Sequence, residues 1–127
     1  MTKNNMIILN RGDTYEFDLT IDDATSSDGR YHIQGDDVIY FGIMDPHQPF
    51  EDALVKKRFT VADADIAGNL TIVIEPDDTL DLLPGTYYYS VKIHLQHENI
   101  NPETNEVDGY IDKVHTVINK TKFFLND

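Results

Sequence analysis

The chain has 127 residues, of which 40% are hydrophobic and 10% aromatic, and this composition suits one folded domain and excludes a disordered chain. It contains no Cys, which excludes disulfides and thiolate metal ligands, and its formal net charge of −13 opposes binding to nucleic acid or to an anionic membrane. The first residues lack the apolar stretch of a signal peptide, and no run approaches the ~20 apolar residues of a membrane span. We therefore expect a single domain over residues 1–127, synthesised in a cytoplasm.

In the first half of the sequence, apolar and polar side chains alternate with a period of two residues, which is typical of strands that bury one face. Residues 14–21 alternate apolar and polar side chains, and residues 38–44 (VIYFGIM) are apolar on both faces, as in a central strand. Between them lies a long polar loop, in which a weak strand is expected at residues 31–33. Residues 45–49 (DPHQP) end the central strand, because proline cannot donate to a β-ladder.

The second half continues this alternation. Residues 54–61 predict a strand with Phe59 and Val61 facing inward, and residues 70–74 predict another. Residues 76–82 predict one short helical turn, because a proline opens the segment and acids follow it.

Residues 87–95 form the longest clean alternation, and the polar residues 98–109 are expected to be a long hairpin loop before a return strand at 110–125. The apolar phase of the return strand slips, and a β-bulge near Asn119 and Lys120 would restore it. Six to eight strands with no long amphipathic helix predict an all-β domain, either a sandwich or a small barrel.

The sequence shows no set of residues typical of catalysis or of metal binding. His94 and His97 are three residues apart, so on one strand they lie on opposite faces and cannot chelate one ion together. Asp63, Asp65 and Gly68 begin like a calcium loop but lack its third acid and its final Glu, which favours a polar turn. With no nucleophile motif and no phosphate loop either, we expect a non-enzymatic protein without metal or cofactor.

Residues 83–89 (LPGTYYY) resemble the tyrosine corner of immunoglobulin-like and fibronectin type III domains. In fibronectin domains the buried Tyr stands three residues after the Gly, which here is Tyr88, whereas the alternation favours burial of Tyr87 and Tyr89. This shifted phase resembles the N-terminal domain of the baseplate upper proteins of phages that infect Gram-positive bacteria. The similarity spans about residues 7–125, and three segments carry it in the same order: RGDTYEFDLTI (11–21), DVIYFGIMD (37–45) and GNLTIVIEPDDTLDLLPGTYYY (68–89).

The resemblance implies an immunoglobulin-like antiparallel β-sandwich of about seven strands. It implies a bacteriophage virion protein, of the baseplate, the tail or another accessory position, that docks onto other phage structural proteins. It also implies a homo-oligomer within a symmetric assembly. Baseplate upper proteins continue into a stalk or receptor-holding region, whereas this sequence ends at Asp127, so we expect the attachment module alone, either free-standing or part of a longer chain.

The candidate docking residues are Pro46, Pro49 and Phe50 in the loop 45–52, together with Tyr88, which the alternation turns outward. Phe50 could equally tuck under its own loop. The polar loop 98–109 is a second candidate surface.

An alternative function is that of a carbohydrate-binding sandwich module for host-surface glycans. It requires exposed aromatic side chains on one face, and the residues to inspect are Tyr31, Tyr40 and Tyr110. A glycan-cleaving enzyme with paired carboxylates ranks last, because no carboxylate lies in an apolar segment.

Overall fold

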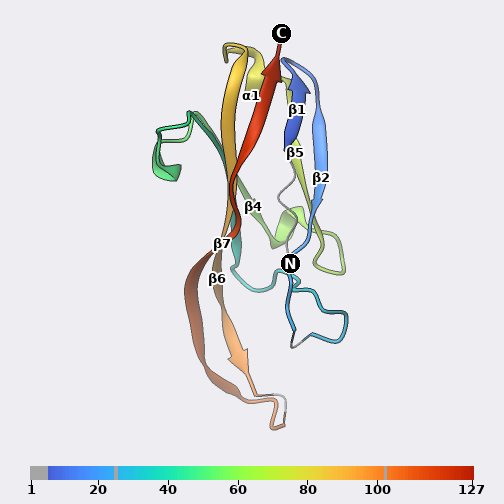
Figure 1. Cartoon of the computed structure of the whole chain (residues 1–127). Helices are drawn as coiled ribbons and strands as arrows, with labels where there is room; N and C mark the ends of the chain where they lie inside the picture. The colour runs from blue at the N-terminus through green and yellow to red at the C-terminus, as the bar shows by residue number, and fades with distance from the viewer. Residues whose placement is uncertain (1–5, 25, 102) are drawn as a thin grey trace.

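The computed structural model describes residues 6–24, 26–101 and 103–127. In chain order the elements are β1 (Ile7–Asn10), β2 (Tyr15–Leu19), β3 (Val38–Met44), η1 (Phe50–Asp52), β4 (Val55–Thr60), η2 (Val61–Asp63), β5 (Leu70–Ile74), α1 (Pro76–Leu80), β6 (Gly85–Ile100) and β7 (Val107–Asn126). They form a five-stranded sheet in the order β1-β7-β6-β3-β4 and a two-stranded sheet of β2 and β5 (Figure 1). No helix in this described part of the chain is long and apolar enough to cross a membrane.

The strand order is that of an immunoglobulin-like sandwich. Strands β7, β6, β3 and β4 follow the order of the G, F, C and C′ strands of a variable-type domain, and β2 and β5 take the places of the B and E strands. The prediction of an all-β, immunoglobulin-like sandwich with about seven strands is therefore confirmed. It was wrong in one respect, because the sandwich is not wholly antiparallel: β1 runs parallel to β7, with Ile7 opposite Phe123 and Asn10 opposite Asn126.

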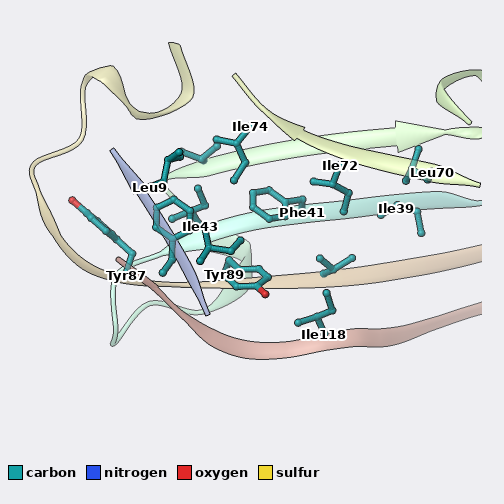
Figure 2. Packing of buried hydrophobic residues seen from close by; sticks show 14 of the residues in the cluster. Leu9, Ile39, Phe41, Ile43, Leu70, Ile72, Ile74, Tyr87, Tyr89 and Ile118 are labelled. Atoms are coloured by element: carbon teal, nitrogen blue, oxygen red, sulfur yellow. The ribbon is translucent and has the colours of Figure 1, made fainter. Parts of the chain in front are cut away.

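Alternating side chains of the two sheets meet in one core (Figure 2). Phe41 of β3 and Ile72 and Ile74 of β5 are almost completely buried there. Tyr87 and Tyr89 of β6 also face this core and are 7% and 2% exposed, so the phase predicted from the sequence is confirmed. Burying an apolar side chain of this size contributes about 1.5–3 kcal/mol, which makes the core the main stabilising feature of the fold.

The turn before β6 is a tyrosine corner. The hydroxyl of Tyr87 donates a hydrogen bond to the backbone carbonyl of Leu83, with 2.5 Å between the oxygens. This bond back to a residue a few positions upstream is the defining contact of the corner in immunoglobulin-like domains. It fixes the direction in which the chain enters β6.

Helix α1 confirms the predicted helical turn near residues 76–82 and joins several parts of the fold. A capping box between Glu75 and Asp78 closes its first turn. Thr79 is completely buried, and its hydroxyl oxygen accepts a hydrogen bond of 2.9 Å from the backbone N–H of Gly12. The ammonium of Lys57 in β4 lies 2.7 Å from a carboxylate oxygen of Asp78. This short helix therefore connects the turn after β1 with one edge of the larger sheet.

The predicted β-bulge is present in β7. Tyr89 lies opposite Thr121 and Val91 lies opposite Ile118, so three steps along β7 correspond to two steps along β6. The extra residue belongs to the segment that contains Asn119 and Lys120, as predicted.

A second irregularity follows at once and was not predicted. Val91 lies opposite Ile118 while Lys92 lies opposite Thr116, so β7 again carries one extra residue. As a result Val114 is 60% exposed although it shares the sequence parity of the buried Ile118.

The predictions for residues 31–33 and for Val61 were wrong. Residues 31–33 form no strand, and the only ladder in that loop is an isolated bridge between Asp22 and Arg30, within the described residues. Val61 does not face inward but is 38% exposed at the start of η2. The physical reason is a capping box between Thr60 and Asp63, which ends β4 one residue earlier than the hydrophobic pattern suggests.

Candidate interaction surfaces

Strands β6 and β7 continue beyond the sandwich as a two-stranded arm, described over residues 95–101 and 103–113, which projects from one end of the molecule (Figure 1). Strand β3 last pairs with β6 at His94, and further along β6 pairs only with β7 as far as Ile100 opposite Val107. The prediction that residues 98–109 form a long loop was therefore wrong. Beyond His97 both faces of the arm meet solvent, so the strands are mostly polar and no regular hydrophobic alternation marks them in the sequence.

One face of the arm carries exposed apolar side chains between polar ones, which include Gln96, Glu98 and Asp112. Directly opposite residues of antiparallel strands share a face, and so do alternate residues of one strand. The register places Val114 opposite His94, Tyr110 opposite Glu98, and Val107 opposite Ile100. Three apolar side chains of this face are between 54% and 58% exposed: Ile100, Val107 and Tyr110. Val114 lies on the same side just outside the arm, at its root, and is 60% exposed.

A buried carboxylate attaches the root of the arm to the loop before β3. Asp37 is completely buried, and one of its oxygens accepts hydrogen bonds from His97 Nδ1–H at 2.9 Å and from the backbone N–H of Gln96 at 2.8 Å. The other oxygen accepts bonds from the hydroxyl of Tyr31 and, at 3.0 Å, from the backbone N–H of Gln34. We call these five residues the Asp37 cluster; it joins the loop 31–37 to the arm.

The electrostatics of the cluster favour an ionised Asp37. Burial raises the pKa of its carboxyl, but the hydrogen bonds from Tyr31, His97 and two backbone N–H groups outweigh burial and hold the pKa below its usual range. Burial and the neighbouring carboxylate together raise the pKa of the Tyr31 hydroxyl far above its usual value. At neutral pH the cluster is therefore a carboxylate held by a neutral phenol, which suits attachment rather than proton transfer.

The sequence analysis did not identify Asp37 as a structural residue. Its available signal was its position directly before strand β3, whose residues are almost all buried. Gly35 is a second missed residue. Its φ is +58°, and a Cβ added there would lie 2.8 Å from the Cβ of His97, so only glycine allows the loop to approach the arm this closely.

The loop 45–52 folds back over the outer face of the larger sheet. The ring of Phe50 covers Gly42 of β3, where an added Cβ would lie 3.0 Å from the ring, and the ammonium of Lys92 lies 5.0 Å from the ring centroid. Met44, at an outward position of the same strand, is completely buried. Lys120 holds the loop from β7 by donating to the carbonyl of Gln48 at 2.6 Å. Phe50 therefore tucks under its own loop and is half-buried.

The other candidate docking residues differ in their exposure and in whether they lie beside Phe50. Pro49 is exposed and lines one shallow groove together with Phe50 and Lys92. Tyr88 is half-buried on the same outer face, opposite Met44. Pro46 is exposed in the preceding turn and does not line the groove.

The three tyrosines of the carbohydrate alternative do not form one platform. Tyr31 belongs to the Asp37 cluster, whereas Tyr40 is half-buried on the outer face of the sheet. Tyr40 lies opposite Lys92 and Tyr110 lies opposite Glu98, which are six residues apart on β6 and therefore about 20 Å apart.

The predicted polar turn at residues 63–68 is present. One carboxylate oxygen of Asp65 accepts hydrogen bonds of 2.9 Å from the backbone N–H groups of Ala67 and Asn69, and this lowers the pKa of the carboxyl. Over the described ranges, no three His, Asp or Glu side chains are grouped so that they could hold a metal ion.

Comparison of the chain with protein-family models, with curated proteins and with solved structures finds no significant match.

Proposed function

We propose that the chain is a non-enzymatic structural protein of a bacteriophage particle, in the baseplate, the tail or another accessory position, and that it docks onto other virion proteins through its arm. The phage assignment rests on the resemblance of residues 7–125 to baseplate upper proteins. The docking role rests on one observation, which is the projecting arm with exposed apolar side chains on one face.

The arm offers a partner two kinds of contact. Its three exposed apolar side chains, Ile100, Val107 and Tyr110, lie on one face, and exposed apolar side chains grouped on a protein surface are typical of interaction sites. The edge of β7 from Val107 to Lys122 that points away from β6 pairs with no other strand of the described chain. An unpaired edge of this length is a template for a strand of another protein.

The Asp37 cluster gives the arm a fixed origin. Its hydrogen bonds hold Gln96 and His97, the residues at which β6 leaves the sandwich. A preorganised arm loses less conformational entropy on binding than a mobile one. Repetition of the chain in a symmetric particle would add avidity to each modest contact.

The test compares wild-type chain with a variant in which residues 98–110 are replaced by Asn-Gly, a two-residue hairpin turn. Mass spectrometry of purified phage particles should detect the wild-type chain, and particles assembled with the variant should lack it. The matched control is Glu103→Gln with Glu106→Gln, which changes the charge of the tip and keeps the arm; this variant should be incorporated.

Circular dichroism and urea unfolding of the purified variant should show an intact sandwich, because the described residues between 98 and 110 contribute no side chain to its core. Absence of the wild-type chain from intact particles would refute the virion role. Incorporation of the arm-deleted variant at wild-type level would instead refute docking through the arm.

A further inference from the structure

The outer face of the five-stranded sheet concentrates positive charge on a strongly acidic protein. The chain has ten Lys and Arg residues against 23 Asp and Glu. The register places Arg58, Tyr40 and Lys92 side by side across three strands, and it places Lys122 beside Tyr88, all facing outward. Half of the ten cationic residues lie on this basic face: Lys56, Arg58, Lys92, Lys120 and Lys122.

Acidic side chains are absent from the outward strand positions of this face among the described residues, from Thr86 to His94 on β6 and at the paired positions of β3 and β4. The loop 45–52 lies over part of this face, and its Glu51 lines one groove together with Lys92 and Lys120. Asp112, at the border, lies with its carboxylate 2.5 Å from His94 Nε2. The basic face is therefore defined by its strand positions, and its cations outside that groove, Lys56, Arg58 and Lys122, are exposed.

The opposite side of the sandwich carries the complementary charge. The outward residues of β2 and β5 are Glu16 and Asp18, which are exposed, together with Thr71 and Val73 opposite them. No Lys or Arg stands at an outward position of these two described strands. Helix α1 adds further exposed acids at one end of this acidic face.

We infer that the basic face binds the acidic face of a second copy of this chain. Charge complementarity supports this occupant, because the matching surface is part of the same molecule and is present wherever the chain is. The two faces lie on opposite sides of the sandwich, so the contact joins the front of one copy to the back of the next. Such a heterologous contact repeats, and it produces a closed ring or a filament rather than a symmetric dimer.

The net charge of −13 sets the salt dependence of this contact. Repulsion between whole copies acts at long range and is screened beyond about 8 Å at physiological ionic strength. Ion pairs at contact are screened less, but at about 1 M salt the screening length falls to about 3 Å and they weaken as well. Association should therefore be strongest at intermediate salt. This inference concerns a surface other than the arm and does not depend on the virion role.

The test measures the oligomeric state by analytical ultracentrifugation for two variants, each of which loses the charge of one face. The first, Arg58→Gln with Lys122→Gln, removes charge from the basic face, and the second, Glu16→Gln with Asp18→Asn, removes charge from the acidic face. The wild-type chain should form oligomers, and each variant alone should associate at least about tenfold more weakly. An equal mixture of the two variants should form a dimer and nothing larger, because each supplies one intact face.

The matched control is Lys113→Gln with Glu103→Gln on the arm, which should keep the wild-type behaviour. The arm-deleted chain should also associate like the wild type, which separates this contact from docking through the arm. A monomeric wild-type chain at every salt concentration would overturn the inference. Unchanged oligomers in both variants, or a mixture that stays monomeric, would overturn it too.

Discussion

At Asp37 four donors converge on one buried carboxylate, two from side chains and two from the backbone. Asp37→Asn keeps the size of the side chain but replaces one acceptor oxygen with a donor, so at least one buried partner loses its hydrogen bond. We expect the free energy of unfolding to fall by about 2–4 kcal/mol at neutral pH, measured by urea denaturation. The exposed neighbour provides the control, since Asp36→Asn should change stability by less than about 0.5 kcal/mol.

The same residue predicts a pH dependence. Its pKa is lower in the folded chain than the value of about 3.9 in an unfolded chain, so its contribution is fully present above about pH 4 and is lost as the pH falls further. The stability difference between wild type and Asp37→Asn should therefore shrink below about pH 4. A difference that stays constant over this acidic range would contradict the assignment.

Tyr87 makes the second prediction at the scale of one residue. Tyr87→Phe keeps the ring in the core but removes the hydrogen bond to Leu83, so the free energy of unfolding should fall by about 1 kcal/mol. Tyr88→Phe is the control, because Tyr88 is half-buried on the outer face and its hydroxyl makes no hydrogen bond to the described residues. Equal losses in both variants would show that the corner adds no stability.

Among the elements, α1 depends on a carboxylate with two roles. Asp78 accepts a hydrogen bond from the backbone N–H of Glu75 at 2.7 Å, and it lies 2.7 Å from the ammonium of Lys57. Asp78→Ala removes the cap and leaves Lys57, whose side chain is 17% exposed, without its nearest counter-ion. The expected loss is about 2 kcal/mol in thermal unfolding. The neighbouring Asp77→Ala should cost less than about 1 kcal/mol, and a reversed order would refute this role of Asp78.

The elements that the sequence predicted well are those with a buried face. The bounds of β3 were predicted correctly because its residues are apolar on both sides, and the bulge in β7 was predicted because the core requires its apolar phase to be restored. The arm was missed for the opposite reason. Beyond His97 neither of its faces is buried, so no regular side-chain pattern distinguishes its strands from a polar loop.

For the whole molecule, the candidate sites were less predictable than the fold. The basic face draws its cations from three strands between Lys56 and Lys122, and only the cross-strand register shows that they share one side. The Asp37 cluster likewise joins residues that are about 60 positions apart in the sequence. Contacts of this kind depend on tertiary structure, which local periodicity does not encode.

The parallel pairing of β1 with β7 has a mechanical consequence. Ile7 begins β1 and Asn126 ends β7, and the two strands point the same way over four paired positions. Tension that pulls these two residues apart along the strand axis slides one strand past the other, so the interstrand hydrogen bonds carry the load together. In an antiparallel pair loaded at adjacent ends, the bonds would open one after another. The chain is therefore built to resist stretching between its two terminal strands.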